Sequence, residues 1–315
     1  PALPLRNAII DPAATDAFRL IHGAADGRAG LYVEQWASWF LVNSESNLPS
    51  DWINSGPSQN AAGIYLKRLD RHVRKSTLES AAPVLARGEP AAERFVIREN
   101  GVQYEASFTQ GYSTGLFLDQ RDNRRRLLTS HIATGYQLST KDYQLLNCFA
   151  YTCGFSVCAA KAGARTTSLD LSKKYLEWGK RNFALNGLDP AAHDFIYGDT
   201  FDWLRRLAKK GRVFDAIVLD PPTFSQSKEH GAFRVEKDYG KLVTAALPAL
   251  KPGGVLLTST NAADWPPEDF LADVDAAGQG AKRKIRQRHY VPQPPDFPIS
   301  RAEPAYLKTV WLGII

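Results

Sequence analysis

The sequence predicts an α/β protein, in which a small α+β domain precedes a doubly wound, mostly parallel sheet of seven strands. From residue 143 onward, short apolar runs alternate with helical segments, which is the pattern of consecutive βαβ units. Residues before about 112 instead show short β-rich runs separated by loops. A length of 315 residues favours one large and one small domain. We therefore expect a small α+β domain over residues 1–85, a β-hairpin linker over 86–112 and the large domain over 113–315.

The N-terminal region is predicted from β-branched and aromatic runs bounded by turn residues. Residues 51–60 are expected to form a short helix or loop, and strands are expected over residues 31–34, 39–43 and 63–67. The basic run over residues 68–75 is either a solvated face or a surface that contacts phosphate. Residues 76–92, rich in Ala, Pro, Glu and Gly, are expected to form a linker. Beyond them, Asn100-Gly101 between two alternating runs is a strong signal for a β-hairpin.

A helix with an unusual charge pattern is expected next, from Asp119, which can cap its N-terminus, to about Ala133. The arginines near its start are Arg121, Arg124, Arg125 and Arg126. Cations at the N-terminus of a helix oppose the helix dipole. At least some of these arginines should therefore have a partner, either an acidic side chain or phosphate.

The large domain is expected to alternate strand and helix up to its last two strands. Predicted strands cover residues 143–149, 166–170, 193–197, 213–219, 255–259, 284–290 and 305–315. Predicted helices cover residues 155–161, 172–186, 201–209, 237–250 and 267–276, the second of them capped by Ser172. Because the last two strands have no helix between them, they can form an antiparallel pair at the edge of the sheet.

The stretch from Leu145 to Asp170 reads as strand, tight turn, helix and second strand ending in an acid, which is the first half of a nucleotide-binding unit. An acid about 20 residues past the turn is placed to accept hydrogen bonds from ribose hydroxyls. The turn lacks a G-x-G-x-x-G pattern, and Gly154 is its only obligate glycine. Since a pyrophosphate needs several glycines for close backbone approach, the turn favours a nucleoside cofactor without pyrophosphate. S-adenosylmethionine is the commonest such cofactor, and a dinucleotide oxidoreductase is disfavoured.

Three successive strands are expected to end in aspartate, at Asp170, Asp199 and Asp220. Ligands of open α/β sheets bind beyond the carboxyl ends of the strands, near the switch in strand order. A single acid there is often only a helix cap, but three in succession favour a binding site. After Asp220, two prolines stiffen the chain ahead of Phe224. This loop could hold a carboxylate against a flat base with the phenylalanine stacked on it, or it could be a stiff turn with a core phenylalanine.

Composition narrows the class of protein further. No apolar run approaches 18 residues, and residues 1–6 lack the apolar segment of a signal peptide. The three cysteines all lie between Cys148 and Cys158, where they cannot form a disulfide framework and are poorly spaced for zinc. We therefore expect a cytoplasmic protein with no metal site and no membrane partner. The formal net charge of +6 fits a nucleic-acid partner without requiring one.

Five motifs resemble those of class I S-adenosylmethionine-dependent methyltransferases, whose fold is Rossmann-like. They are Thr114-Gly-Leu-Phe-Leu-Asp-Gln-Arg, Asn147-Cys-Phe-Ala-Tyr-Thr-Cys-Gly-Phe-Ser, Thr167-Ser-Leu-Asp-Leu-Ser, Gly198-Asp-Thr-Phe-Asp-Trp-Leu and Asp220-Pro-Pro-Thr-Phe-Ser-Gln-Ser-Lys. More narrowly, residues 90–315 resemble the bacterial large-subunit (23S) ribosomal RNA methyltransferase family, and residues 19–33 resemble the small domain that precedes its catalytic domain. The guanine-N7 branch is the most similar, through the last motif and the run that begins at Tyr175.

The resemblance implies S-adenosylmethionine as the cofactor and a role for each matching residue. Cofactor contacts are expected from Asn147, Phe149, Tyr151, Thr152, Gly154, Asp170, Leu171, Asp199, Thr200 and Asp220. Among them, Phe149, Tyr151 and Thr152 would line the methionine end of the cofactor. Asp170 would bind the ribose hydroxyls, and Asp199 would accept a hydrogen bond from the adenine amino group.

The resemblance also implies which residues receive the target base. The expected catalytic residues are Asp220, Pro221, Pro222, Phe224 and Asn261. Asp220 and Pro221 would face the methyl group and the base. Asn261 would contact the edge of the base, unless it only forms a turn. Asp119 and Arg121 would close the pocket from the preceding segment.

The cysteines bear on which atom is methylated. Cytosine C5 is activated by a cysteine thiolate that adds at C6, but the loops that follow the fourth and fifth predicted strands contain no cysteine. Cys148 and Cys158 are expected in the core, and Cys153, which stands where the family often has glycine, lies on the far side of the cofactor from the target. Guanine N7 has a free lone pair and needs alignment with the methyl group.

The expected function is therefore methylation of an RNA base, with large-subunit ribosomal RNA as the expected RNA and guanine N7 as the expected acceptor. An exocyclic amine is the alternative acceptor, and cytosine C5 is disfavoured. A small-molecule methyltransferase is opposed by the basic runs. A catalytically silent RNA-binding or ribosome-assembly factor remains a further alternative, which cofactor binding would distinguish.

Overall fold

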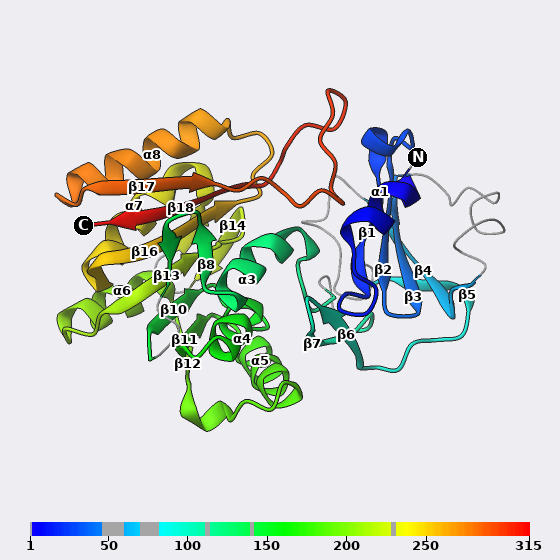
Figure 1. The fold of residues 1–315 in the computed structure, drawn as a ribbon, viewed down its shortest axis with the longest axis horizontal. Helices are drawn as coiled ribbons and strands as arrows, with labels where there is room; N and C mark the ends of the chain where they lie inside the picture. Colours follow the sequence, from blue (N-terminus) through cyan, green and yellow to red (C-terminus); the bar gives the residue numbers. More distant parts are fainter. Residues whose placement is uncertain (1, 46–59, 70–81, 111–113, 139–141, 228–230) are drawn as a thin grey trace. The chain divides into compact units, whose positions relative to one another are not determined.

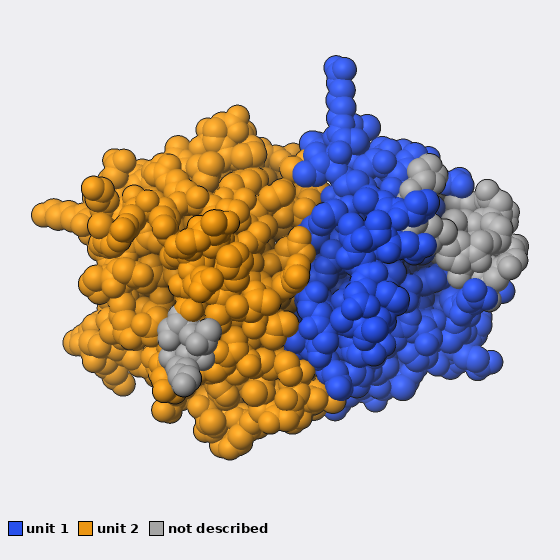
Figure 2. Space-filling view, viewed as in Figure 1, with its two compact units in different colours: residues 1–121, 294–304 blue, residues 122–293, 305–315 orange. Residues whose placement is uncertain are grey.

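The computed structural model describes residues 2–45, 60–69, 82–110, 114–138, 142–227 and 231–315 (Figure 1). The chain forms two compact units, coloured separately in Figure 2. The first comprises residues 1–121 and 294–304, and the second comprises residues 122–293 and 305–315. The predicted helix or loop at residues 51–60 and the basic run at 68–75 lie largely outside the described residues.

The first unit is built on a five-stranded sheet in the order β1-β2-β3-β4-β5. Its strands are β1 (Ala17–His22), β2 (Leu31–Trp36), β3 (Trp39–Ser44), β4 (Gly63–Arg68) and β5 (Val84–Gly88), and helix α1 (Ala2–Ile9) contacts β1. Neighbours are antiparallel except β3 and β4. Alternate side chains such as Leu31, Val33 and Val42 form its apolar core.

Two elements of this unit differ from the sequence prediction. Strand β1 was not predicted, and β5 lies inside residues 76–92, which were predicted to be a linker. The alanine- and proline-rich composition there indicates a loop locally. Pairing of Leu85 with Tyr65 of β4 makes it an edge strand. Such pairing depends on chain far away in sequence, which composition does not report.

The predicted hairpin is confirmed as β6 (Phe95–Glu99) and β7 (Val102–Ala106). Asn100 and Gly101 both have positive φ, +51° and +76°, as a two-residue type I′ turn requires. The hairpin belongs to the first compact unit. The functional division at residues 85 and 112 stays a prediction.

The second unit contains the predicted seven-stranded sheet, in the order β12-β11-β10-β13-β16-β18-β17. The strands are β10 (Gln144–Cys148), β11 (Arg165–Asp170), β12 (Asp194–Tyr197), β13 (Phe214–Leu219), β16 (Leu250–Thr260), β17 (Ile285–Tyr290) and β18 (Lys308–Ile314). Only β18 runs antiparallel to its neighbours, which confirms the antiparallel edge. The strand order reverses between β10 and β13, so their carboxyl ends define the switch point.

Helices cover both faces of this sheet (Figure 1). They are α4 (Gly154–Lys161), α5 (Lys173–Leu185), α6 (Thr200–Lys209), α7 (Val235–Ala246) and α8 (Pro267–Gly280). Leu146 and Cys148 of β10 share one core with α6, α7 and α8. Asn147, between them, points to the other face, where its amide donates to Ser156 Oγ of α4 at 3.0 Å. This alternation is the reason that a doubly wound sheet needs helices on both sides.

The helix predicted from Asp119 to Ala133 is shorter than expected. Helix α3 covers Arg121–Leu128, after a 3₁₀ turn at Leu118–Gln120 that contains Asp119. Ser130 has φ of +54°, which ends the helix, and the chain continues as β8 (His131–Ala133) and β9 (Tyr136–Gln137). Asp119 therefore lies within the 3₁₀ turn, one residue before the position that immediately precedes α3. Arg125 and Arg126 lie in the last turn of the helix, where cations favour the dipole, so the shorter helix removes part of the expected conflict.

Candidate functional site

The turn after β10 carries unusual backbone strain. Phe149, Tyr151 and Cys153 have φ of +58°, +49° and +64°, whereas Gly154 is simply the first residue of α4. Gly154, predicted to be the obligate glycine of the turn, is not among the residues with positive φ, and the cofactor contact predicted for it stays a prediction. Left-handed backbone at non-glycine residues costs about 1–3 kcal/mol each and concentrates at ligand sites. Surrounding bonds must therefore fix this turn.

Buried hydrogen bonds hold the strained turn in place. The amide of Cys153 donates to Ala150 O at 2.7 Å, and Asn182 Nδ2 of α5 donates to Thr152 O at 2.9 Å. Thr152 is fully buried. These bonds tie the turn to its own chain and to the neighbouring helix.

Cys153 fits into a space left by a glycine. A Cβ atom added at Gly179 of α5 would lie 2.3 Å from Cys153 Sγ and 2.9 Å from Cys153 Cβ. Burial raises the pKa of the Cys153 thiol to about 12, so it packs as a neutral side chain. The side chain that Cys153 adds, where the family often has glycine, is thus accommodated by the absence of a side chain at Gly179.

Asp170 at the end of β11 organises the same turn. Its Oδ2 accepts from the amide of Tyr151 at 2.8 Å, and its Oδ1 accepts from the amide of Ser172 at 2.8 Å. Burial raises the pKa of this carboxyl, while the two amide bonds act in the opposite direction. Each oxygen keeps a second lone pair, so the bonds are compatible with the predicted contact to ribose, which stays a prediction.

Asp199 has a structural partner of its own. It is the N-cap of α6, and its side chain accepts from the amide of Asp202 at 3.2 Å. Gly198 precedes it, and a Cβ there would lie 2.2 Å from Trp203 Nε1. Close approach of the indole therefore shapes the start of this helix. Capping and adenine recognition can coexist, since one carboxylate accepts several hydrogen bonds.

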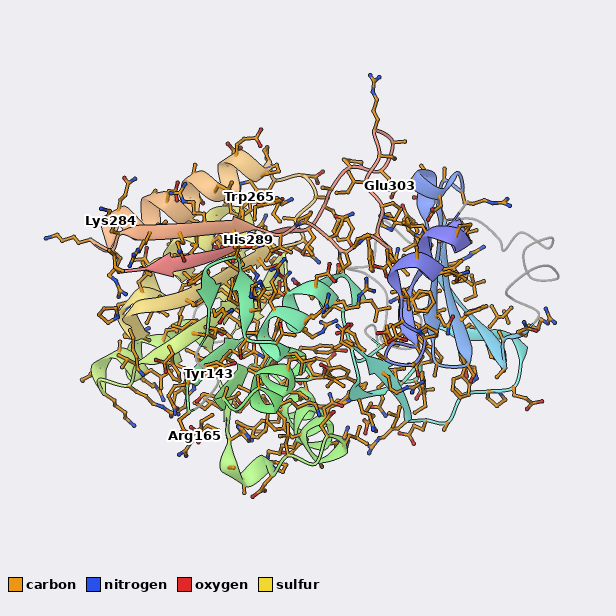
Figure 3. All side chains as sticks on the ribbon, in the orientation of Figure 1. Tyr143, Arg165, Trp265, Lys284, His289 and Glu303 are labelled. Carbon is orange, nitrogen blue, oxygen red and sulfur yellow. The ribbon has the colours of Figure 1, made fainter. Side chains whose placement is uncertain are left out.

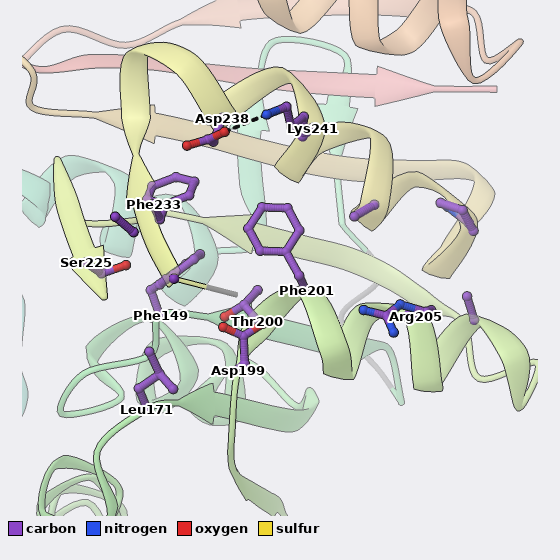
Figure 4. A pocket seen from close by; sticks show the side chains of 15 residues that line it. Phe149, Leu171, Asp199, Thr200, Phe201, Arg205, Ser225, Phe233, Asp238 and Lys241 are labelled. Atoms are coloured by element: carbon purple, nitrogen blue, oxygen red, sulfur yellow. Dashed lines mark hydrogen bonds and ion pairs between the residues drawn. The ribbon is translucent and has the colours of Figure 1, made fainter. Parts of the chain in front are cut away.

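A cavity of about 540 Å³ opens beside these residues, entirely within the second unit (Figure 4). Four of its lining residues were predicted to contact the cofactor, namely Phe149, Leu171, Asp199 and Thr200. The lining residues that the prediction missed are Phe201, Arg205, Ala208, Ser225, Gly231, Ala232, Phe233, Asp238, Lys241, Ala245 and Pro248. The size and the apolar walls with a few polar groups are typical of a small-molecule site.

A short hairpin that the sequence analysis did not predict forms one wall of the cavity. It comprises β14 (Phe224–Ser227) and β15 (Gly231–Arg234), which pair antiparallel. Phe233 is 8% exposed, and its ring centroid lies 6.1 Å from that of Phe149 and 6.1 Å from that of Phe201. Gly231 has φ of +73° and ends a polar run, which is the signal that could have revealed the hairpin.

The loop that begins at Asp220 lies at the switch point, next to the end of β16. Leu219 pairs with Thr258, so Asp220 and Asn261 follow neighbouring strand ends. Pro221 is buried, whereas Pro222, Phe224 and Asn261 are exposed. These residues do not line the 540 Å³ cavity. The exposure of Phe224 and Asn261 is compatible with contact to a base, which stays a prediction.

The other predicted cofactor residues have different surroundings. Asn147 belongs to a buried network, because Ser156 Oγ also accepts from Ser168 Oγ at 2.8 Å. Asp119 and Arg121 lie in the first unit. The Arg121 guanidinium donates to both oxygens of Asp296, at 2.8 and 2.6 Å, which confirms that an arginine of this group has an acidic partner. The cofactor contacts predicted for these residues stay predictions.

The cavity has features that a nucleoside pocket without a phosphate loop requires. Apolar walls from Phe149, Leu171 and Phe201 suit an adenine ring, and Asp199 also lines the cavity. Asp170, at the end of β11, is not among the lining residues. Within the described ranges, no group of three His, Cys, Asp or Glu side chains is arranged to hold a metal ion. The described helices include none with the length and apolarity to cross a bilayer.

The sheet order and this pocket define the class of nucleoside-binding α/β enzymes, and comparison with known proteins gives the family. The chain belongs to the S-adenosylmethionine-dependent methyltransferases, whose family model matches residues 59–311. Its cofactor is accordingly S-adenosylmethionine.

Individual relatives cover most of the chain. A ribosomal RNA large subunit methyltransferase of Deinococcus radiodurans is 33% identical over 99% of this chain and 76% of its own. The ribosomal RNA large subunit methyltransferase I of Aeromonas salmonicida is 36% identical over 96% of this chain and 76% of its own. The crystal structure of a methyltransferase complexed with SAH superposes with a TM-score of 0.84 at 28% identity, covering 99% of this chain and 79% of that one. These matches agree with the fold and the cofactor.

Proposed function

We propose that this chain methylates a base of large-subunit ribosomal RNA, and that the acceptor atom is N7 of guanine. The relatives from Deinococcus radiodurans and Aeromonas salmonicida, both named as ribosomal RNA large subunit methyltransferases, support the choice of RNA. The formal net charge of +6 is suited to a polyanionic substrate. A ribosomal substrate would place the enzyme in the cytoplasm.

The observation that carries the choice of acceptor is the position of the cysteines. Cys148 and Cys153 are fully buried and Cys158 is 2% exposed. Burial raises the pKa of Cys148 as well as that of Cys153, so neither forms a thiolate at neutral pH. The strand-end loops at residues 220–224 and 258–263 contain no cysteine. The nucleophile that cytosine C5 methylation requires is therefore lacking at the switch point.

Guanine N7 suits the groups that are present. Bound S-adenosylmethionine supplies a methyl group on a positively charged sulfonium. N7 attacks with its lone pair and loses no proton, so the protein needs no general base and contributes alignment instead. The charge that passes to the guanine ring would be balanced by the carboxylate of Asp220. An exocyclic amine would in addition have to release a proton.

Mapping of modified nucleosides tests this proposal directly. Ribosomal RNA from a deletion strain should lack one 7-methylguanosine, and a plasmid copy of the gene should restore it. A plasmid copy with Asp220→Ala should fail to restore it while the purified variant still binds SAH by calorimetry. Asp170→Ala should weaken SAH binding more than it slows transfer at saturating cofactor. An unchanged guanine profile in the deletion strain would refute the N7 assignment, and loss of a methylated exocyclic amine would replace it.

A further inference from the structure

A buried tyrosine lies beneath the two loops that are proposed to receive the base. Tyr239 lies in α7 and is fully buried. Its ring packs edge-on against Trp265, at 5.9 Å between centroids, and against Phe270, at 5.2 Å (Trp265 is labelled in Figure 3). This aromatic cluster leaves the ring little freedom to move.

The hydroxyl of Tyr239 joins the ends of two strands. It donates to Leu219 O at 3.1 Å and accepts from the amide of Ser259 at 2.7 Å. Leu219 is the last residue of β13, directly before Asp220, and Ser259 precedes Asn261 by two residues. One oxygen atom therefore bridges the ends of β13 and β16, at the point where their ladder of backbone pairs stops and the two loops begin.

The segment around Asn261 is fixed on its other side as well. Lys308 of β18 is 1% exposed, and its Nζ donates to Ala262 O at 2.6 Å. The amide of Ala262 also donates to Thr260 Oγ1 at 3.2 Å. Backbone on both sides of Asn261 is thus held, while its side chain is exposed. Such an arrangement presents a side chain in one defined place.

We propose that Tyr239 is a positioning residue for methyl transfer, whose hydroxyl fixes the loop that begins at Asp220 relative to the segment that carries Asn261. This inference rests on the proposed function, because it takes these two loops as the site of the target base. Misplacement of reacting groups by about 1 Å can slow a reaction about 100-fold. A hydroxyl that spans both loops therefore controls the rate without touching substrate.

The protonation state of Tyr239 agrees with this role. Burial raises the pKa of the phenol well above its ordinary value, and the nearby charge of Asp220 raises it further. The phenol is therefore protonated at neutral pH, and it can donate to Leu219 O. Its action is steric alignment through two hydrogen bonds, with no proton transfer.

Tyr239→Phe removes the hydroxyl and keeps the ring. The matched control is Tyr143→Phe, at a tyrosine that is 2% exposed. Tyr143 directly precedes the amino-terminal end of β10, whereas Tyr239 bonds near the carboxyl ends of β13 and β16. Among the described residues the hydroxyl of Tyr143, which is labelled in Figure 3, has no hydrogen-bond partner. The assay measures single-turnover methyl transfer to unmodified 23S ribosomal RNA of the deletion strain. Enzyme and S-adenosylmethionine are both present at saturating concentrations. We expect the rate of Tyr239→Phe to fall at least tenfold, with the Kd for SAH changed less than twofold and Tyr143→Phe like the wild type.

Hydrogen–deuterium exchange tests, independently of activity, whether the Tyr239 hydroxyl holds the two strand ends. In Tyr239→Phe, exchange should accelerate in peptides that cover residues 216–222 and 257–263 and stay unchanged over β10 and β11. A rate within twofold of wild type, or uniform acceleration across the sheet, would overturn the positioning role. Failure of the wild-type enzyme to methylate the RNA would instead count against the proposed function, and the exchange experiment would still test the bridge between the two strand ends.

Discussion

The contact between Cys153 and Gly179 allows a quantitative test of how tightly the turn after β10 packs against α5. Gly179→Ala puts a Cβ atom 2.3 Å from Cys153 Sγ, where ordinary contact is well over 3 Å. Replacing a helical glycine by alanine would by itself stabilise α5 by about 1 kcal/mol. Overpacking of a buried site costs about 1–3 kcal/mol. The upper end applies, because Cys153 lies in a turn whose backbone is hydrogen-bonded on both sides. The net expectation is destabilisation by about 2 kcal/mol.

A second substitution should restore the lost stability. Cys153→Gly removes the side chain that the new Cβ would strike and relieves about 1–2 kcal/mol of left-handed strain. The next nearest atom to that Cβ is Thr152 C at 3.5 Å, which is ordinary contact. The double variant Cys153→Gly/Gly179→Ala should therefore be close to the wild type in stability. The coupling energy between the two sites should be about 3 kcal/mol, because the overpacking is present in Gly179→Ala and absent from the double variant.

Thermal unfolding with and without SAH measures these differences. For a unit of this size, 2 kcal/mol corresponds to a fall in Tm of about 4–8 °C. Gly240→Ala is a matched control, since a Cβ in that helix would meet nothing closer than Asp273 O at 3.7 Å. It should leave Tm unchanged or raise it. The reasoning is refuted if Gly179→Ala is as stable as Gly240→Ala, or if Cys153→Gly fails to rescue it.

Three further predictions follow from single side chains. Asp199→Asn should keep the cap of α6 and leave Tm unchanged, while it weakens SAH binding. Asp199→Ala should lower both Tm and the affinity for SAH. Equal calorimetric affinity for the wild type and Asp199→Asn would contradict adenine recognition. Burial and the neighbouring Arg19 lower the pKa of His22 from 6.5 to about 4, so the unfolded state binds the extra proton between these values. Stability of the first unit should therefore fall as pH drops from about 6.5 to 4, by at most about 3 kcal/mol, and His22→Phe should flatten that part of a urea-denaturation pH series. Arg121→Met should destabilise the first unit by about 3–5 kcal/mol, because it leaves the fully buried Asp296 without its guanidinium partner, and unchanged urea stability would show that the pair is dispensable.

Elements whose causes are local could be predicted from the amino-acid sequence. Alternation of apolar runs and helical segments located the seven strands of the large sheet, since the side-chain period of an element is written in consecutive residues. Ser172 and Asn100-Gly101 were identified correctly for the same reason, because a cap and a type I′ turn involve residues three or fewer positions apart. The aspartates at the strand ends could likewise be placed at one edge of the sheet, since parallel strands share their carboxyl edge.

Features that depend on residues far apart in the sequence became visible in the folded chain. Edge strand β5 forms by pairing with β4, although its composition suggests a linker. Residues 294–304 belong to the first unit, where Asp296 accepts a hydrogen bond from the amide of Arg19. In the turn after β10 the left-handed residues are Phe149, Tyr151 and Cys153, and Gly154 is not one of them. Hydrogen bonds from other elements hold this strained backbone, which local preference would avoid. Tyr239 is a further example, since nothing in its own helix indicates that its hydroxyl joins the ends of two strands. Local propensity is carried by neighbours in sequence, whereas strain, pairing and bridging are carried by neighbours in space, and these appear only when the chain has folded.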